Sequence, residues 1–226
     1  MSTRDREPVS TSRTTRTTSR GLARREQILG VATTMFLAHG YAGVSIDEIV
    51  KAVGGSKTNV YSQFGSKEGL FSTLVEALCA DLLRDFQAMD LEGMELAQGL
   101  KTLASTLLAI LLEERHLAFQ RLIIAESGRF PALARVWLDS GPQQSRRIIA
   151  RFLEARQRAG QLRVSDAMRA ATLFHDMVVS NPTHLAMLGA PPSARDIDQF
   201  IDDVIDTFLH GHATQPGPAR TSRAQA

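Results

Sequence analysis

The polar residues of segment 56–67 have types and spacing that favour one chemistry, which is contact with nucleic acid. Val60 and Phe64 lie four residues apart and can anchor one face of a short helix. The other positions of that helix carry polar or amphipathic side chains, namely Lys57, Thr58, Asn59, Tyr61, Ser62 and Gln63. This is a poor design for a core helix, but it presents hydrogen-bond donors and acceptors to base edges and phosphates in a major groove.

A phosphate site is expected where this helix ends. Gly65 and Ser66 end the helix and cap the next one, whose first turn carries Lys67. Free backbone amides, the positive end of a helix dipole and an adjacent lysine together form a natural phosphate clamp. Two alternatives stay open: Lys57 and Lys67 could be ordinary surface lysines, and Tyr61 could pack into the core. We favour DNA contact for all three, because the apolar anchors already fix which side of the helix faces outward.

A second short helix is predicted just before this one. Ser45 followed three residues later by Glu48 forms a capping box, so a helix should begin directly after Ser45. Its apolar face recurs at helical spacing through Ile46, Ile49, Val50 and Val53. Gly54 and Gly55 should end it, since glycine adopts the left-handed conformation at no steric cost. Two short helices, a glycine turn and the start of a longer helix are typical of a helix-turn-helix DNA-binding unit.

Residues 24–78 resemble the N-terminal DNA-binding domain of the TetR/AcrR family of transcriptional regulators. The resemblance is carried by the run RREQILGVATTMFLAHGYAGVSIDEIV and by the later pattern SK..VY..FGSKEGLF. It implies that Lys57, Thr58 and Ser62 face base edges. It also implies phosphate contacts for Ser45, Asn59, Tyr61, Gln63 and Lys67. Two positions depart from the family pattern: valine is usual where Gly55 stands, which bears on the turn, and Gly-Thr is common at residues 58–59, which bears on the operator sequence.

The composition fits such a regulator. With 226 residues, 43% of them hydrophobic, the chain can bury a sizeable core in one large domain or two unequal ones. Residues 1–70 hold ten Lys or Arg and six Asp or Glu, a net charge of +4, whereas the whole chain carries +2. Positive charge is therefore concentrated where DNA is expected.

Several other classes of protein are disfavoured. The single cysteine, Cys79, excludes an intramolecular disulfide and a zinc cluster of thiolates, is expected to be buried, and favours the reducing cytoplasm. No apolar run reaches the roughly 18 residues that span a bilayer, so we expect no membrane partner. Enzyme motifs such as G-x-S-x-G, H-E-x-x-H and G-x-G-x-x-G are missing, and Gly55-Ser56-Lys57-Thr58 lacks the glycine before lysine of a phosphate-binding loop. We therefore expect no enzyme, no cofactor and no metal.

The remaining periodic segments all predict helix, so the expected class is all-α. Helices are predicted at 24–38, 67–89, 94–114, 115–127, 131–139, 142–159, 166–188 and 194–211. The helix at 67–89 would be about 33 Å long and would join two domains. The expected organisation is a disordered basic arm (1–22), a helix-turn-helix domain (23–70), a helical effector-binding and dimerisation domain (71–212) and a disordered tail (213–226). The arm either touches DNA through its five arginines or is a dispensable tail.

The last two predicted helices carry broad apolar stripes. The resemblance implies that these helices form a four-helix homodimer interface with a second copy of the chain. A dimer also suits a short recognition helix, because two such helices spaced by about 34–36 Å meet successive major grooves. The expected DNA partner is therefore a double-stranded operator with an inverted repeat.

The resemblance further implies a cavity for a small, mainly apolar effector whose binding releases DNA. The candidate lining residues are Phe86, Leu107, Phe119, Ile123, Trp137, Phe174, His175 and Met177. His175 and Trp137 could instead be packed core residues. The segment FQRLIIAESGRFPALARVWLDSGP is similar to the C-terminal domain of the AefR-like branch, which points to control of efflux or transport genes.

A different function stays open at this point. The same fold could serve an effector-independent, DNA-binding architectural or interaction protein. A contiguous apolar cavity favours the ligand-responsive repressor, whereas a filled core with an exposed apolar patch favours the alternative.

Overall fold

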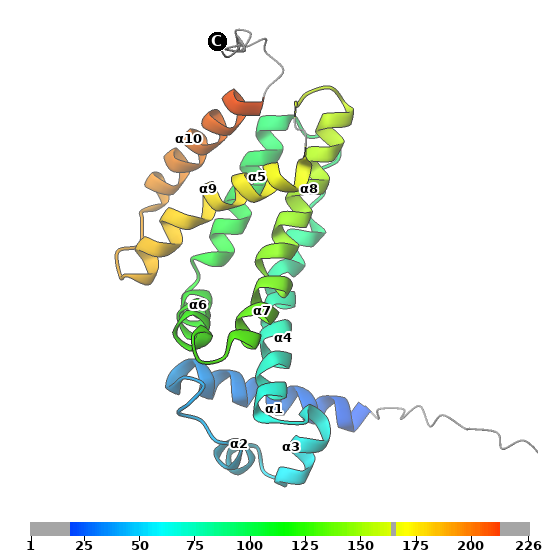
Figure 1. Cartoon of the computed structure of the whole chain (residues 1–226), viewed down its shortest axis with the longest axis vertical. Helices are drawn as coiled ribbons and strands as arrows, with labels where there is room; N and C mark the ends of the chain where they lie inside the picture. The colour runs from blue at the N-terminus through cyan, green and yellow to red at the C-terminus, as the bar shows by residue number, and fades with distance from the viewer. Residues whose placement is uncertain (1–18, 164–165, 213–226) are drawn as a thin grey trace, which may run out of the picture.

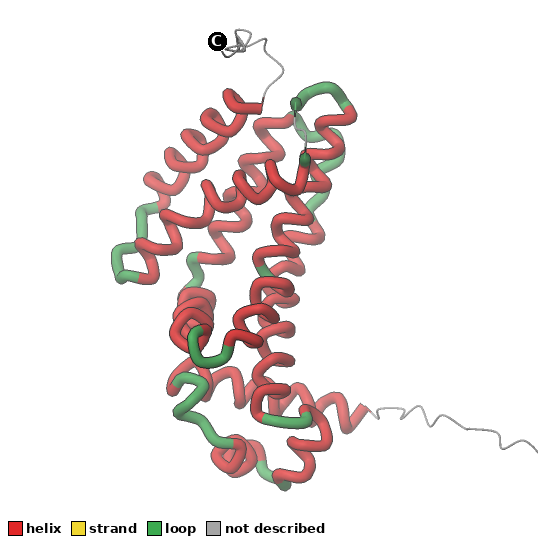
Figure 2. Tube along the Cα trace, viewed as in Figure 1, coloured by secondary structure: helices red, strands yellow, loops and turns green. Residues whose placement is uncertain are grey.

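The computed structural model describes residues 19–163 and 166–212, and over these residues the chain forms ten helices and no β-strand (Figures 1 and 2). The all-α prediction is confirmed. The helices are α1 (Ser19–His39), α2 (Ile46–Val53), α3 (Lys57–Phe64), α4 (Lys67–Ala88), α5 (Leu96–Leu111), α6 (Glu114–Ser127), α7 (Pro131–Ser140), α8 (Pro142–Arg158), α9 (Ala167–Met187) and α10 (Ala194–His212).

One expected boundary is wrong. Helix α1 begins at Ser19, so residues 19–22 are helical rather than part of a disordered arm. Arg20 and Leu22 extend the helix toward the N-terminus, beyond the segment that carries the apolar repeat. Hydrophobic periodicity therefore does not predict that they are helical. The rest of the expected arm, residues 1–18, and the expected tail, residues 213–226, lie outside the described residues.

Three serines explain where three successive helices begin. The capping box is present at α2: the Ser45 hydroxyl accepts from the Glu48 amide, and the Glu48 carboxylate accepts from the Ser45 amide at 2.7 Å. The Ser56 hydroxyl accepts from the Asn59 amide at the start of α3, and Ser66 does the same for the Gly69 amide at the start of α4. Because each cap satisfies an orphan backbone donor, the start of each of these three helices follows from local sequence.

The hydrophobic side chains form two core clusters. The first joins α1 to α4 with α6 and α7, and includes Phe119, Leu122, Ile123 and Leu133. The second joins the C-terminal half of α4 with α5, α8, α9 and α10. Helix α4 runs from α3 up between the other helices, as Figure 1 shows. Its buried residues from Leu70 to Cys79 belong to the first cluster, and Leu83 and Phe86 belong to the second. The proposed boundary between residues 70 and 71 therefore divides roles within α4, and the packing is continuous across it.

Within the first cluster, aromatic rings join the turn after α1 to α4 and to the start of α7. Tyr41, in the turn after α1, contacts Phe71 of α4 and Phe130 at the start of α7, with ring centroids 5.0 and 4.6 Å apart. The Phe36 ring of α1 contacts both Tyr41 and Phe71, and its centroid lies 5.7 Å from that of Tyr41 and 5.2 Å from that of Phe71. Such pairs add stabilisation beyond the area that they bury.

No single helix in the described part of the chain is long and apolar enough to cross a membrane, although the bent pair α5 and α6 passes that test when taken together.

Candidate functional site

Helix α3 has the two-sided character that the sequence predicts. Val60 and Phe64 are buried, at 2% and 8% exposure, and hold the helix against the domain. The outward positions Lys57, Thr58, Asn59, Tyr61 and Ser62 are exposed, and Gln63 is half-buried. Tyr61 is 46% exposed, so the alternative in which its ring packs into the core is wrong.

Several of these polar groups already have partners in the free protein. The Lys57 ammonium lies 2.6 Å from the Asp47 carboxylate of α2. The Gln63 amide donates to the Asn59 side chain at 2.6 Å, and the Ser62 hydroxyl donates to the Asn59 carbonyl at 2.9 Å. Because these contacts lie at the surface, exchange of such partners for base edges or phosphates costs little.

Two of the expected phosphate contacts have structural roles. The Ser45 hydroxyl is used in the α2 cap, where it donates to the Glu48 carboxylate at 2.8 Å. These bonds from Ser45 hold the pKa of Glu48 below its usual value. The Lys67 ammonium lies 4.3 Å from the centre of the Tyr41 ring, and partial burial lowers the pKa of this lysine. The ring thus holds Lys67 at the N-terminal end of α4.

The sequence reasoning missed two arginines of α1 that position the helix-turn-helix unit. Arg24 donates to the Val53 carbonyl at 2.9 Å and to the Gly54 carbonyl, at the C-terminal end of α2. Arg25 donates to the Gln63 carbonyl at 3.0 Å, and its guanidinium lies 4.4 Å from the centre of the Phe64 ring. Each arginine therefore caps one helix of the unit. The two adjacent arginines are visible in the sequence, but their contacts with carbonyls 29 or more residues away are not.

The glycine pair of the turn allows a sharp test of this arrangement. Gly54 and Gly55 both have positive φ, at 72° and 105°. A Cβ atom at Gly54 would meet nothing within 4 Å, whereas one at Gly55 would lie 2.6 Å from the Arg24 guanidinium. We expect Gly54→Ala to cost about 1–3 kcal/mol through backbone strain alone, because a φ of 72° with a ψ of 165° is essentially restricted to glycine. Gly55→Ala should cost about 1 kcal/mol more, since it also displaces Arg24 from its carbonyls.

Thermal and urea denaturation of the two alanine variants measures this difference. Equal losses in the two variants would show that the Arg24 contact contributes nothing to the turn.

A cavity of about 190 Å³ lies in the helical domain behind the DNA-binding unit. Helices α4 to α9 all contribute to its wall. Most of the lining is apolar, with Cys79, Leu82, Leu83, Leu107, Ile110, Leu111, Trp137, Leu138, Gly141, Pro142 and Val179. Burial raises the pKa of the Cys79 thiol to about 12, so this cysteine is an uncharged part of the wall.

Three of the eight expected lining residues lie in this wall: Leu107, Trp137 and His175. Phe119 lines a neighbouring, more polar opening that shares Leu82, Ile110 and His116 with the cavity. The other four lie outside the wall. Phe86 and Phe174 belong to the second core cluster, and Met177 packs against that cluster. Ile123 belongs to the first cluster. Apolar periodicity identified these residues as inward-facing, but it does not say which inward positions border empty space.

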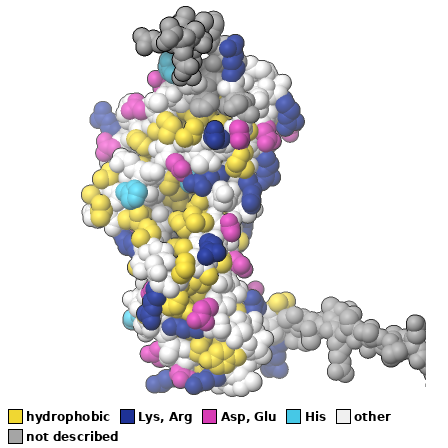
Figure 3. All heavy atoms as spheres, viewed as in Figure 1, with side chains coloured by type: hydrophobic (Ala, Val, Ile, Leu, Met, Phe, Trp, Pro, Cys, Tyr) yellow, Lys and Arg dark blue, Asp and Glu magenta, His cyan; other side chains and the backbone are white. Residues whose placement is uncertain are grey.

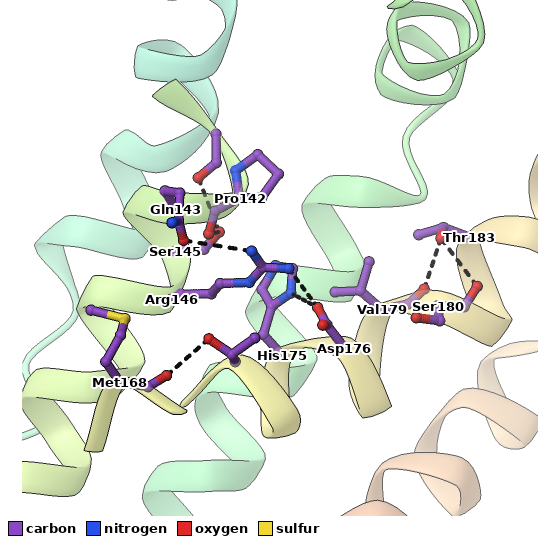
Figure 4. Close-up of polar contacts among 12 residues, drawn as sticks. Pro142, Gln143, Ser145, Arg146, Met168, His175, Asp176, Val179, Ser180 and Thr183 are labelled. Atoms are coloured by element: carbon purple, nitrogen blue, oxygen red, sulfur yellow. Dashed lines mark hydrogen bonds and ion pairs between the residues drawn. The ribbon is translucent and has the colours of Figure 1, made fainter. Parts of the chain in front are cut away.

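The polar part of the wall was missed except for His175. It consists of His116 and Gln120 on α6 and Ser145 and Arg146 on α8. Figure 4 shows His175 and Asp176 of α9 facing Arg146 of α8. The Asp176 carboxylate accepts from Arg146 at 2.8 Å and lies 2.9 Å from Nδ1 of His175.

Both imidazoles of the wall are uncharged at neutral pH. Burial, reinforced by Arg115, lowers the pKa of His116 to about 4. Burial also lowers the pKa of His175, and Arg146 adds to this effect while Asp176 opposes it. Within residues 19–163 and 166–212, no group of three or more His, Cys, Asp or Glu side chains is placed to hold a metal ion.

These features define a class of protein, an all-helical regulator with an N-terminal helix-turn-helix unit and a helical domain that encloses a cavity. Residues 28–74 match the tetR family of bacterial regulatory proteins, and residues 98–214 match the C-terminal domain of AefR-like transcriptional repressors. The second match alone spans more than half of the chain. The chain belongs to the TetR family of transcriptional regulators.

Solved structures agree with this assignment. A TetR-family transcriptional regulator of Mesorhizobium loti MAFF303099 has a TM-score of 0.78 and 28% identity, over 87% of this chain and 100% of that one. The flavonoid-responsive regulator FrrA has a TM-score of 0.78 and 34% identity, over 86% of this chain and 99% of FrrA.

Among curated relatives, the HTH-type transcriptional regulator QacR of Staphylococcus aureus (strain Mu50) is 45% identical over 47 residues, or 21% of this chain. The chain spans only about a quarter of the length of the curated relatives that it matches. Regulators of the TetR family bind DNA operators as dimers and respond to small ligands.

Proposed function

We propose that this chain is a ligand-responsive transcriptional repressor that binds an inverted-repeat operator as a homodimer and is released by a small, mainly apolar effector. The observation that carries the proposal is the cavity of about 190 Å³, walled by six helices and connected to the recognition helix α3 through α4. Helix α4 begins beside α3 at Lys67 and places Cys79, Leu82 and Leu83 in the cavity wall. We propose no enzymatic role.

Helix α6 offers a second route from the cavity to DNA. It places His116 and Gln120 in the cavity wall, while at its other end the Glu126 carboxylate accepts from the Ala42 amide of the DNA-binding unit at 3.4 Å. Arg121, between them, donates to the Ala186 and Met187 carbonyls at the end of α9, both at 3.2 Å. A ligand that shifts α6 therefore disturbs both the DNA-binding unit and α9.

The dimer is proposed to form through α9 and α10. Helix α9 exposes large apolar side chains that packing within one subunit leaves uncovered: Met168 at 40%, Leu173 at 50%, Leu185 at 37% and, just after the helix, Leu188 at 83%. On α10, Ile197, Phe200 and Leu209 are only partly buried. Figure 3 shows patches of hydrophobic side chains on the part of the surface where Figure 1 places α9 and α10. A second copy would cover them by a self-complementary contact.

The relatives support a proposal for the target genes and the effector class. The AefR-like match of residues 98–214 supports control of efflux or transport genes, as the resemblance in the sequence implies. FrrA is a flavonoid-responsive regulator, which supports a small organic effector for this chain as well. The cavity favours this function over the effector-independent architectural alternative.

The test is an operator-release experiment. Footprinting upstream of the gene and its neighbours should reveal a protected inverted repeat, and fluorescence anisotropy then gives the operator affinity with and without candidate effectors. We expect a compound that raises the melting temperature to lower the operator affinity. Compounds that occupy the cavity and leave DNA binding unchanged would contradict the proposal.

The proposed division of α3 into base contacts and phosphate contacts gives a separate prediction. Lys57→Ala should relax discrimination at one or two base pairs, at the lower end of the about 1–3 kcal/mol typical of a base contact. Tyr61→Phe should instead weaken binding to all sequences alike, because a phosphate contact carries no sequence information. Competition binding with single-base operator variants measures both. Lys51→Ala, an exposed lysine of α2, is the control. An unchanged base preference in Lys57→Ala would remove this lysine from the base-reading set.

A further inference from the structure

The cavity wall holds three buried polar side chains whose hydrogen-bonding capacity is unused. His116, Gln120 and His175 are 6%, 8% and 5% exposed, and all three line the cavity. Within the described residues, the side chains of His116 and Gln120 have no hydrogen-bond partner, and the His175 ring is bonded only through Nδ1. A fourth wall group, the Nε–H of Arg146, is buried and also has no partner. Buried polar groups normally have partners, so a molecule in the cavity is the natural source of the missing ones.

The hydrogen-bonding role of His175 is fixed by its neighbours. The Asp176 carboxylate can only accept, and Arg146 holds it at 2.8 Å, so the Nδ1 atom of His175 carries the proton of the neutral ring. Nε2 is then left with a lone pair. Figure 4 shows this chain of contacts from α8 to α9. The cavity therefore presents a positioned acceptor, and a ligand must supply the donor.

The charge of the wall limits the ligand further. None of the described residues that line the cavity carries a carboxylate, so a cationic ligand would lose its hydration without gaining an opposite charge. Arg146 is the one charged group among the described lining residues, and its charge is already balanced by Asp176, which disfavours a full anion. Its Nε–H has no partner and can donate to a neutral oxygen of the ligand. The two histidines are neutral, because burial lowers the pKa of each. An uncharged ligand is the one that this wall suits.

We infer that the effector is an uncharged aromatic compound of one or two rings that carries a hydroxyl group, and that this hydroxyl donates to Nε2 of His175. The rings pack between Trp137 and the leucines and isoleucine of the wall, in a volume of about 190 Å³. The Gln120 amide, which can both donate and accept, meets a second polar group where the compound has one. The inference rests on the proposed function, since it names the class of molecule that occupies the proposed effector cavity.

The test is a matched series of two-ring compounds added to the full-length protein. 2-Naphthol carries the hydroxyl, 2-methoxynaphthalene has the same rings without a donor, 2-naphthoate is an anion, and 2-naphthylmethylamine is a cation at neutral pH. Thermal shift and isothermal calorimetry give the affinities. We expect 2-naphthol to bind about tenfold more tightly than the methoxy compound, the size of one neutral hydrogen bond, and more tightly than either ion.

A variant then locates the contact. His175→Phe keeps a ring in the wall but removes the acceptor, so 2-naphthol should fall to the affinity of 2-methoxynaphthalene. His184→Phe, which changes an exposed histidine of the same helix, should keep the tenfold preference. Where His175→Phe does not melt cooperatively, His175→Asn replaces it, because the asparagine amide can still donate to Asp176 without presenting the ring acceptor.

The outcomes separate the two claims. Equal binding of the hydroxyl and methoxy compounds, tighter binding of either ion, binding of no compound, or an unchanged preference in the His175 variant would overturn the inference. Tight binding of 2-naphthol that leaves operator affinity unchanged would overturn the proposed function while the chemistry of the cavity stands.

Discussion

Replacing Phe36 by alanine is expected to lower the free energy of unfolding by about 3–5 kcal/mol, the usual cost of removing a buried aromatic side chain. Phe36 is fully buried, and its ring contacts those of Tyr41 and Phe71 at 5.7 and 5.2 Å. These neighbours are held by other contacts, among them Phe130 on Tyr41, so they cannot collapse fully into the space left behind. Urea denaturation followed by circular dichroism measures the change.

The matched control for this variant lies on the same helix. Leu22 is 50% exposed, so Leu22→Ala should change stability by less than about 0.5 kcal/mol. A loss below about 1.5 kcal/mol in Phe36→Ala would mean that the aromatic cluster repacks and is not a rigid joint between the DNA-binding unit and α7.

Replacing Gly99 by alanine is expected to destabilise the helical domain by about 3 kcal/mol, at the upper end of the usual cost of overpacking. Gly99 is buried in α5, and a Cβ atom there would lie 2.2 Å from the Phe152 ring of α8. The ring itself is buried at 5% exposure, so it has little room to move. The sign of the change in unfolding free energy is informative, because a glycine-to-alanine substitution within a helix otherwise stabilises the protein by about 1 kcal/mol.

Two companion variants test the cause. Gly30 lies in α1 with nothing within 4 Å of an added Cβ, so Gly30→Ala should raise stability by about 0.4–1 kcal/mol. The double variant Phe152→Leu/Gly99→Ala should lose less unfolding free energy than the sum of the losses in the two single variants. The reason is that the smaller leucine side chain makes room for the added methyl group. Additive losses in this double-mutant cycle would rule out the contact with Phe152 as the source of the effect.

The DNA-binding segment could be predicted from the sequence almost residue by residue, because its signals are local. Ser45, Ser56 and Ser66 cap helices within three residues of themselves, and Val60 and Phe64 fix the orientation of α3 within one turn. The resemblance to the TetR family predicts the family, and the matches to residues 28–74 and 98–214 confirm it.

The cavity could be predicted only in part, because it depends on how six helices meet. Hydrophobic periodicity marks Phe174 and Leu107 alike as inward-facing, yet Phe174 packs 5.1 Å from Phe208 while Leu107 borders the cavity. The same pattern places polar residues outside, so it gave no signal for the buried His116 and Gln120. Long-range caps such as that of Arg25 on α3 were invisible for the same reason.

The continuous core around Phe36, Leu122 and Leu133 has a consequence for how this protein can be recombined. Exchange of residues 1–70 with those of a relative would replace one side of a packed interface and leave α6 and α7 facing foreign side chains. A working chimera must therefore include the contacting positions of α6 and α7 together with the N-terminal segment. Otherwise the chimera is destabilised, and its loss of DNA binding would be mistaken for a change in DNA preference. Modularity in this chain follows the packing of its side chains rather than the order of its helices.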